Sequence, residues 1–417
     1  MLTIYRIFAS TVVCGLFLVH TQVSEAQYSA STGAGLRTAI DSANADGVDS
    51  TITITGTLIL NQFSPSGSGE DLNASGDLDI LESGTKLTIV GSGANPAIHV
   101  YESWTSDRIF HVHSGAELVV QGVYLKAQKA MGANVIGDSI YNSGTLTLDT
   151  CTLYGSNNVP FGGSSGGIEN LGTATITDCV FINSKGKPST SGGVRNWGNL
   201  YVSGTEFNNC RETTYYGSAI SNRGGYVEIL SSDFHDNVGY GGTVYNSNDG
   251  SGNSGLIEID GTTFTDNQAG GGGAIWNADG DVYCANTTFD GNTGAEGGAV
   301  HCVPYATGIT VTMEFDTCTF VYNEGPSGGA LEFGSSIGAT CTAVFYDCLI
   351  EYNEAYQEGG GIRATEGGTT SVSLYDSEIR NNLAGVHGGG IDEHGTTVFL
   401  SNTPVHSNSP DNIYSVP

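Results

Sequence analysis

The densest group of chemically active side chains lies near the end of the chain, in the segment His387-Gly-Gly-Gly-Ile-Asp392-Glu393-His394. Two histidines and two acids this close together can bind a metal ion or serve as acid and base. The run of glycines, however, belongs to a repeat that recurs along the chain, and polar side chains are expected where a repeat array ends. We therefore assign neither a catalytic residue nor a metal ligand from this segment.

The repeat has two parts, spans 24 to 31 residues and begins near residue 138. Its first part is a small residue, an apolar anchor, any residue and often Asn, as in Gly167-Ile-Glu-Asn170 and Ala274-Ile-Trp-Asn277. Its second part is an apolar residue followed by x-x-Asn, as in Phe264…Asn267 and Phe289…Asn292. The two parts alternate without a skip through ten turns, which indicates a solenoid.

The residue types of the repeat predict an all-β fold, a right-handed parallel β-helix with three strands per coil. Helical solenoids need longer stretches with a period of 3.6 residues, and glycine is unfavourable inside a helix. Here the apolar runs are short and alternating, as in Leu146-Thr-Leu148 and Val372-Ser-Leu374, and Gly, Asn and Asp separate them. Coils stacked about 4.8 Å apart place equivalent residues above one another.

Stacking turns each conserved position of the repeat into a column. We interpret the first asparagine column as structural, because side-chain amides in a column can hydrogen-bond along the axis and satisfy one another. Its members are Asn142, Asn170, Asn196, Asn222, Asn246 and Asn277.

Another column contains cysteines. No cysteine pair has the CxxC spacing of a zinc site. Neighbours in a column lie within the Cα distance of a disulfide, so Cys151–Cys179 and Cys318–Cys348 can be bridges between adjacent coils. Buried free thiols are the alternative.

The residue after each first anchor is expected to point outward. On this face we predict an exposed aromatic and basic strip formed by Arg195, Trp197, Arg223, Tyr245 and Trp276. Such a strip suits stacking against sugars or contact with a protein partner. Scattered surface aromatics are the alternative interpretation.

Enzymes with this fold include polysaccharide lyases and glycoside hydrolases. A lyase needs a basic residue beside acidic Ca²⁺ ligands, and no Arg or Lys of the repeat region, Lys185 and Lys187 included, lies in an acidic cluster of the sequence. The segments typical of polygalacturonases (Asn-Thr-Asp, Asp-Asp, Gly-His-Gly and Arg-Ile-Lys) are missing. Stacked coils can still pair carboxylates without a linear motif. A carbohydrate-active enzyme therefore remains the alternative to a non-catalytic protein.

The net charge of -30 excludes nucleic acid and anionic membrane surfaces as partners, because both need a basic face. This charge suits solubility, divalent cations or neutral glycans. We expect no cofactor, although the acidic composition is compatible with Ca²⁺.

The N-terminus predicts export. Arg6 precedes the apolar run from Ile7 to His20, and Ser24-Glu-Ala26 offers a cleavage site, so we expect a signal peptide at 1–26. No second long apolar run predicts a membrane-spanning segment after cleavage. We expect an N-terminal cap with the first irregular coils at 27–137, including a short helix around Leu36 to Ala43, and the repeat β-helix at 138–417.

Two resemblances agree with this organisation. The segments Gly35-Leu-Arg-Thr-Ala-Ile40, Leu87-Thr-Ile-Val-Gly91 and Asp107-Arg-Ile-Phe-His-Val112 are similar to the N-terminal region of CSLREA-type exported β-helix proteins, without that family's name motif. Gly272-Gly-Ala-Ile275 and Gly297-Gly-Ala-Val300, each followed by an FxxN segment, resemble the repeats of chlamydial polymorphic outer-membrane proteins. The resemblances imply a secreted or cell-surface β-helix protein, adhesin-like or structural, that binds an extracellular glycan or a surface protein.

Overall fold

The computed structural model describes residues 25–60, 73, 76–81, 83–100, 108–127, 139–155, 167–186, 191–212, 216–365 and 367–416. Residues 1–24 of the expected signal peptide and Lys187 lie outside these described residues. In the described part, α1 (Gly33–Asp46) is the only helix and all other elements are strands.

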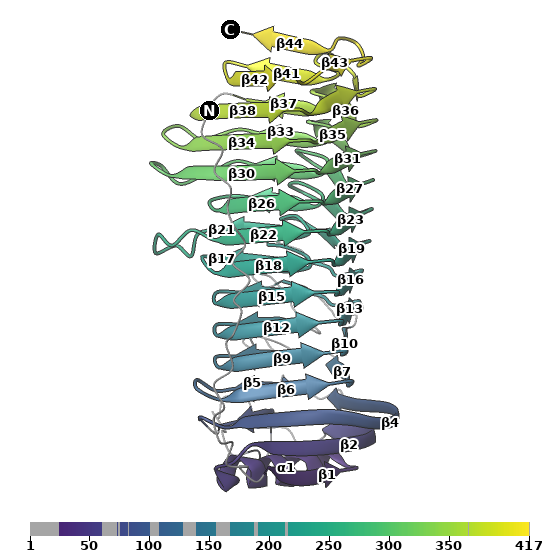
Figure 1. Cartoon of the computed structure of the whole chain (residues 1–417), viewed down its shortest axis with the longest axis vertical. Coiled ribbons are helices and arrows are strands. Elements are labelled where there is room, and N and C mark those ends of the chain that lie inside the picture. Colours follow the sequence, from purple (N-terminus) through teal and green to yellow (C-terminus); the bar gives the residue numbers. More distant parts are fainter. Residues whose placement is uncertain are drawn as a thin grey trace, which may run out of the picture.

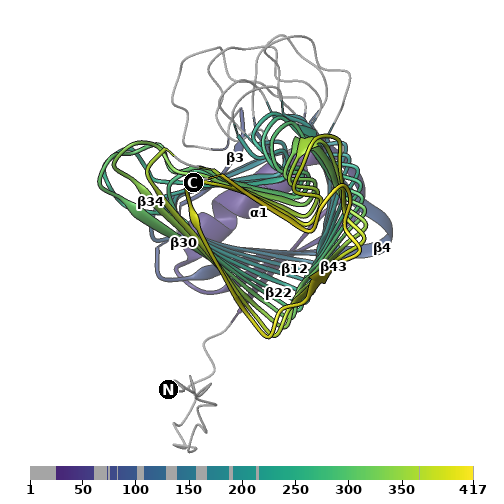
Figure 2. The ribbon, with the colours of Figure 1, turned by 90° about the horizontal axis from the view of Figure 1, so that it is seen from above.

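The strands form flat coils that stack along one axis, and every strand pairs in parallel with its equivalent in the next coil (Figures 1 and 2). This arrangement confirms the parallel β-helix with three strands per coil. Seen along the axis, the coils superpose and enclose a common interior (Figure 2).

The largest sheet has 25 strands and supplies two strands to each regular coil. Its first strands are β1 (Ala26–Ala30), β2 (Ser50–Leu60), β4 (Lys86–Val100), β6 (Glu117–Gln121) and β7 (Tyr124–Ala127). The first strands of the regular coils are β9 (Thr145–Asp149), β12 (Thr173–Thr177), β15 (Asn199–Ser203), β18 (Tyr226–Leu230), β22 (Leu256–Asp260), β26 (Asp281–Ala285), β30 (Thr310–Asp316), β34 (Thr340–Tyr346), β38 (Thr369–Tyr375) and β42 (Thr397–Ser401). The second strands are β10 (Thr152–Tyr154), β13 (Val180–Ile182), β16 (Glu206–Asn208), β19 (Asp233–His235), β23 (Thr263–Thr265), β27 (Thr288–Asp290), β31 (Thr319–Val321), β35 (Leu349–Glu351), β39 (Glu378–Arg380) and β43 (Val405–His406).

A 13-stranded sheet forms another side of the coils, and a six-stranded sheet lies between the two in the later coils. The 13 strands are β3 (Leu78–Ile80), β5 (Phe110–Val112), β8 (Ile140–Asn142), β11 (Ile168–Asn170), β14 (Val194–Asn196), β17 (Ile220–Arg223), β21 (Val244–Ser247), β25 (Ile275–Asn277), β29 (Val300–Cys302), β33 (Leu331–Phe333), β37 (Ile362–Ala364), β41 (Ile391–His394) and β44 (Ile413–Val416). The six are β20 (Val238–Gly239), β24 (Gln268–Ala269), β28 (Thr293–Gly294), β32 (Glu324–Ser327), β36 (Glu354–Glu358) and β40 (Leu383–Ala384).

The helix α1 lies at the N-terminal end of the stack, where it contacts β1, β2 and β3 (Figure 1). Thr32 caps its first turn, and its apolar residues are buried in the core, as the amphipathic pattern predicts. In this region β2 and β4 are longer than the strands of the regular coils. Each of them continues around a corner of the coil: β4 pairs with both β6 and β7, and β2 pairs with β4 on both sides of the corner.

The core consists of stacked apolar columns. The first anchors, such as Ile220 and Ile275, are fully buried. In the second column, neighbouring phenylalanine rings stack with centroids 4.6 to 5.2 Å apart between Phe181 and Phe320. Aromatic pairs at this distance add to the stabilisation from buried area alone.

Two asparagine ladders run along the corners of the core. In the first, predicted ladder, each Nδ2 donates to the Oδ1 of the next coil over 2.7 to 3.2 Å from Asn142 to Asn277. The second ladder uses the FxxN asparagines, with equivalent bonds of 2.9 to 3.0 Å from Asn237 to Asn408. Its amides also donate to the carbonyl of a residue in the preceding coil, such as Phe234 O from Asn267.

The glycine pairs of the repeat are required by close packing of successive coils. A Cβ atom on Gly272 would lie 2.5 Å from the backbone nitrogen of His301, and one on Gly273 would lie 2.5 Å from the carbonyl oxygen of Gly298. Backbone atoms of the next coil cannot move away from such contacts without breaking the strand pairing. Any side chain at these two positions would therefore separate the coils locally.

Candidate functional site

The 13-stranded sheet presents one continuous column of outward-facing residues, which we call the outer column. The middle residue of each short strand faces away from the core, because side chains alternate along a strand. Backbone pairing places each member beside the next. The members are Asp79, His111, Tyr141, Glu169, Arg195, Ser221, Tyr245, Trp276, His301, Glu332, Arg363, Asp392 and Tyr414.

The outer column is recessed although it faces outward. Seven members are less than a tenth exposed, namely Asp79, Glu169, Ser221, Trp276, His301, Glu332 and Asp392. Several of their polar atoms are buried without a hydrogen-bond partner: Asp79 Oδ2, Ser221 Oγ, Trp276 Nε1, His301 Nδ1, Glu332 Oε2 and Asp392 Oδ2. Folded proteins rarely leave buried polar atoms unpaired, so this concentration makes the column the candidate site for a ligand.

The predicted strip lies in the middle of the outer column. The guanidinium carbons of Arg195 and Arg223 lie 4.9 and 5.0 Å from the ring centre of Trp197. Trp197 Nε1 donates to Glu169 Oε1 over 3.0 Å, and Arg195 Nη1 lies 3.4 Å from the same oxygen. A further aromatic residue, Tyr216, was not predicted: its ring lies 5.0 Å from the Arg223 guanidinium, and its hydroxyl accepts a 2.8 Å bond from Arg223 Nη1.

The aromatic contacts continue toward the C-terminal end. Tyr216 meets Tyr245 edge to face at 6.0 Å, and Tyr245 meets Trp276 at 5.5 Å. Trp276 in turn contacts His301 at 5.8 Å and Tyr305 at 6.3 Å. Tyr216 and Tyr305 lie in turns outside the repeat pattern, so periodicity gives no signal for either.

The strip is less exposed than the sequence interpretation supposed. Trp276 is only 8 % exposed, and the other four predicted residues are partly buried. The rings and guanidinium groups cover one another, which explains the recess. Arg195 Nε and Arg223 Nε are buried without a hydrogen-bond partner, so both guanidinium groups keep donor capacity for a ligand.

An acid–histidine group follows the strip directly. Glu296, His301 and Glu332 each offer one ligand atom, and these atoms lie within 4.8 Å of one another. Burial lowers the pKa of His301 to about 4, so the ring is neutral at pH 7. Burial raises the pKa of Glu332 to about 7. The charge of Arg363 lowers this pKa, and the nearby carboxylate of Glu296 raises it. We call these three residues the Glu296 cluster.

The candidate segment at the end of the chain forms a second group. Asp392 is fully buried and contacts both histidines, with His387 Nδ1 and His394 Nε2 each 2.9 Å from one of its oxygens. Glu358 joins from the preceding coil, 3.4 Å from His387, and also pairs with Arg363 at 2.9 Å. Glu393 does not take part, because its carboxylate accepts a hydrogen bond from Ser415.

A third group lies near the N-terminal end. His113 Nε2 and His111 Nδ1 lie 2.8 and 3.3 Å from Asp79 Oδ1, and the two imidazole rings stack at 3.7 Å. Repeat periodicity provides no signal for this group, because its residues precede the regular coils. Three acid–histidine groups thus lie along one face of the rod.

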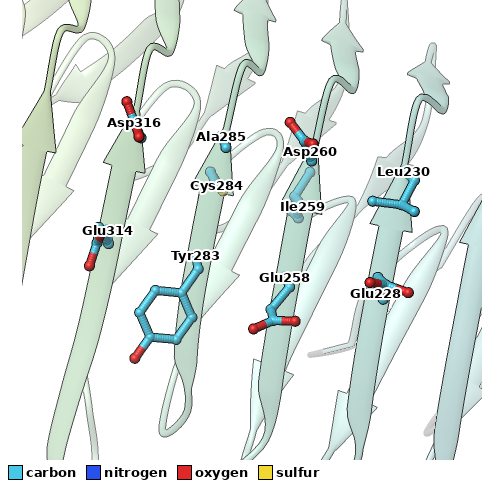
Figure 3. Close-up of a pocket in the computed structure, with 10 residues that line it drawn as sticks. All are labelled: Glu228, Leu230, Glu258, Ile259, Asp260, Tyr283, Cys284, Ala285, Glu314 and Asp316. Atoms are coloured by element: carbon cyan, nitrogen blue, oxygen red, sulfur yellow. The ribbon is translucent and has the colours of Figure 1, made fainter. Parts of the chain in front are cut away.

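A separate depression of about 520 Å³ lies on the outside of the 25-stranded sheet (Figure 3). Acidic side chains from adjacent strands line it, among them Glu228, Glu258 and Glu314, together with Tyr283. Glu258 accepts a 2.6 Å hydrogen bond from Tyr226. The depression is open, all charged side chains that line it are acidic, and its lining includes none of the buried unpartnered atoms found in the outer column. It is therefore a weaker candidate.

All eight cysteines among the described residues are buried, and this structure joins none of them in a disulfide. The backbone nitrogens of Cys151 and Cys318 lie 3.3 and 3.4 Å from the sulfurs of Cys179 and Cys348, so each predicted pair occupies adjacent coils. The two disulfides themselves stay predictions. A contact that was not predicted joins Cys302 and Cys341, whose sulfurs are 3.3 Å apart.

Comparison with known proteins gives one result for the repeat. Residues 261–278 match the model of the Chlamydia polymorphic membrane protein repeat. The matched segment contains Phe264 and Asn267 of the core columns and Trp276 of the strip. No curated protein matches the chain. Among the described residues, no helix has the length and apolar character needed to cross a bilayer. The chain is thus a parallel β-helix protein with repeats of the polymorphic membrane protein type, which indicates a protein of the cell surface or envelope.

Proposed function

We propose that this chain is an exported, adhesin-like and non-catalytic surface protein that binds an acidic glycan at the strip around Trp197. The observation that carries the proposal is the pair of guanidinium groups, Arg195 and Arg223, packed around one tryptophan with their Nε atoms unpartnered. Export through the signal peptide at 1–26 is part of the proposal. N-terminal sequencing of the exported protein tests it, and a mature chain that begins at Gln27 would support it.

The local charge favours an acidic ligand. The chain has 13 basic and 43 acidic residues, yet two arginines meet on this face, where Arg195 is in ion-pair contact with Glu169. An arginine fork matches a carboxylate with two parallel hydrogen bonds, and this geometry is stronger than neutral pairing. A uronic acid presents such a carboxylate together with an apolar sugar face for the neighbouring rings.

The stacked coils suit an extended ligand. Tyr245 and Trp276 continue the aromatic surface over two further coils, so successive sugar units can contact successive coils. Long-range repulsion from the acidic rod decays over about 8–10 Å at physiological salt, whereas the arginine contacts act at contact distance. A short acidic oligosaccharide is therefore a better probe than a long polymer.

The test is calorimetric titration of the mature protein with an oligogalacturonide and, in parallel, with a neutral oligosaccharide of equal length. We expect binding of the acidic ligand only, and at least a tenfold loss of affinity in Arg223→Gln and Trp197→Leu. Arg380→Gln is the matched control, because Arg380 lies on β39 in the other sheet and pairs with Glu351. Equal binding of both ligands, or unchanged affinity in Arg223→Gln, contradicts the proposal.

The same mixtures test the enzyme alternative. Release of new reducing ends or of unsaturated sugars from the oligogalacturonide would show a carbohydrate-active enzyme and overturn the non-catalytic assignment. An intact ligand after prolonged incubation supports binding alone.

A further inference from the structure

The Glu296 cluster lies beside the strip, and the glycan proposal assigns it no role. His301 comes from β29 and Glu332 from β33, and backbone pairing places the two side by side in adjacent coils. Glu296 comes from the turn that leads into β29. One ligand atom from each of the three residues lies within 4.8 Å of the other two.

Two atoms of the cluster are buried without partners. Arg363 Nη1 lies 2.9 Å from Glu332 Oε1 and holds that side of the carboxylate, whereas Glu332 Oε2 has no hydrogen-bond partner. His301 Nδ1 is also buried and unpartnered. Each of these two residues is 5 % exposed. A buried polar atom without a partner is unfavourable, so two of them side by side point to a missing ligand.

We propose that Glu296, His301 and Glu332 bind one divalent transition-metal ion of the Zn²⁺ class. Zinc binds imidazole nitrogen and carboxylate oxygen, and three protein ligands leave one position open for water or another ligand. Ca²⁺ fits less well, because it takes six to eight oxygen ligands and no imidazole. Arg363 acts as the outer residue that orients Glu332, as second partners of metal ligands commonly do.

The other two acid–histidine groups are weaker candidates on the same criteria. In the C-terminal group, Asp392 Oδ2 and His394 Nε2 also lack a hydrogen bond, but they lie 2.9 Å from each other as an ion pair. Glu358 of this group is paired with Arg363. In the N-terminal group, one carboxylate oxygen of Asp79 already serves both histidines. Of the three groups, the Glu296 cluster is the one whose unpartnered carboxylate oxygen and imidazole nitrogen are not in ion-pair contact with each other.

The experiment uses the full mature chain, freed of metal with EDTA, and adds Zn²⁺ alone. Calorimetry gives the stoichiometry, Co²⁺ substitution gives an absorption spectrum that reports a nitrogen and oxygen ligand set, and thermal melting reports coupling to the fold. We expect Glu296→Gln to weaken the tightest Zn²⁺ site at least tenfold and His301→Gln to abolish it. Glu296 is exposed and lies in a turn, so its substitution leaves folding intact.

Control variants separate this site from the others. His111→Gln alters the N-terminal group and His394→Gln the C-terminal group, and both are expected to keep the tightest Zn²⁺ site. If Glu296→Gln, Glu332→Gln and His301→Gln all bind Zn²⁺ with the stoichiometry and affinity of the unmodified protein, the proposal is wrong. Glycan titration in EDTA is independent of this result, so failure of one proposal does not imply failure of the other.

Discussion

The interior asparagine ladders and the outer column run along the same coils, but the buried polar atoms of the ladders are hydrogen-bonded and several of those in the outer column are not. Every described ladder amide from Asn237 to Asn382 donates to the next coil and to a backbone carbonyl. In the outer column, Ser221 Oγ, Trp276 Nε1 and Glu332 Oε2 are just as buried but have no hydrogen-bond partner.

The difference follows from repetition. A solenoid places equivalent positions above one another, so a column of identical amides satisfies its own donors and acceptors. The outer column changes residue type at nearly every coil, from acid to histidine to aromatic to arginine, and its members cannot satisfy one another in this way. Residues that repeat therefore build the rod, whereas residues that break the repeat along one face leave some buried polar atoms without a hydrogen-bond partner.

The largest expected effect lies in the ladder. Asn267→Ala removes donations from its Nδ2 to Phe234 O and Asn292 Oδ1, and it removes the acceptor for the backbone and side-chain amides of Asn237. Several buried polar groups lose partners at once, so we expect a loss of roughly 3–5 kcal/mol in the free energy of unfolding. Urea denaturation followed by circular dichroism measures this loss.

The adjacent residue provides the control for this substitution. Gln268 is exposed and lies at the next position of the same coil, so Gln268→Ala is expected to change stability by less than about 0.5 kcal/mol. Equal stability of the two variants would show that the ladder contributes little to the free energy of unfolding. The hydrogen bonds that distinguish the ladder from the outer column would then not stabilise the fold.

The sequence predicted the ladder side of this comparison well. Anchors such as Ile275, the phenylalanines and the first asparagine column all recur with a period, and stacking then determines their neighbours. The second ladder was also visible in the FxxN pattern, although its hydrogen bonds were not anticipated. Periodicity supplies the information because each turn is a copy of the last.

The outer column was predicted only in part. Arg195, Trp197 and Arg223 were found because they occupy fixed offsets from the anchors. Tyr216 and Glu296 were missed because they lie in turns, whose lengths vary between coils, so no offset assigns them to a face. Burial of Trp276 was missed as well, since strand alternation gives the direction of a side chain but not what neighbouring turns place over it.

The next effect concerns Cys210, which takes the asparagine position at the start of the second ladder and donates its backbone amide to Asn237 Oδ1 over 2.9 Å. Burial raises the pKa of this thiol from 9.0 to about 12. A raised folded-state pKa gives stability that is present below pH 9 and is lost as the pH rises toward 12. At pH 10 the unfolded chain therefore gains about 1.4 kcal/mol from ionising this thiol.

Comparison of the parent chain with Cys210→Ala checks this pH dependence. Under reducing conditions, the unfolding free energy of the parent is expected to fall by about 1.4 kcal/mol more than that of the variant between pH 8 and pH 10. The remaining thiols and tyrosines contribute equally to both chains. Parallel pH profiles would contradict the buried, uncharged state of Cys210.

The smallest effect compares two buried serines of neighbouring coils. Ser191 Oγ lies 2.8 and 3.0 Å from the carbonyl oxygens of Gly217 and Ala219 and shares its single proton between them, whereas Ser221 Oγ has no hydrogen-bond partner. Ser191→Ala is expected to cost about 1 kcal/mol in unfolding free energy, and Ser221→Ala to cost nothing or to stabilise slightly, because it removes a buried hydroxyl that was never satisfied. Urea midpoints measured without added ligand distinguish the two. An equal cost for Ser221→Ala would mean that its hydroxyl is satisfied in the unliganded protein, and the outer column would then be as complete as the ladders.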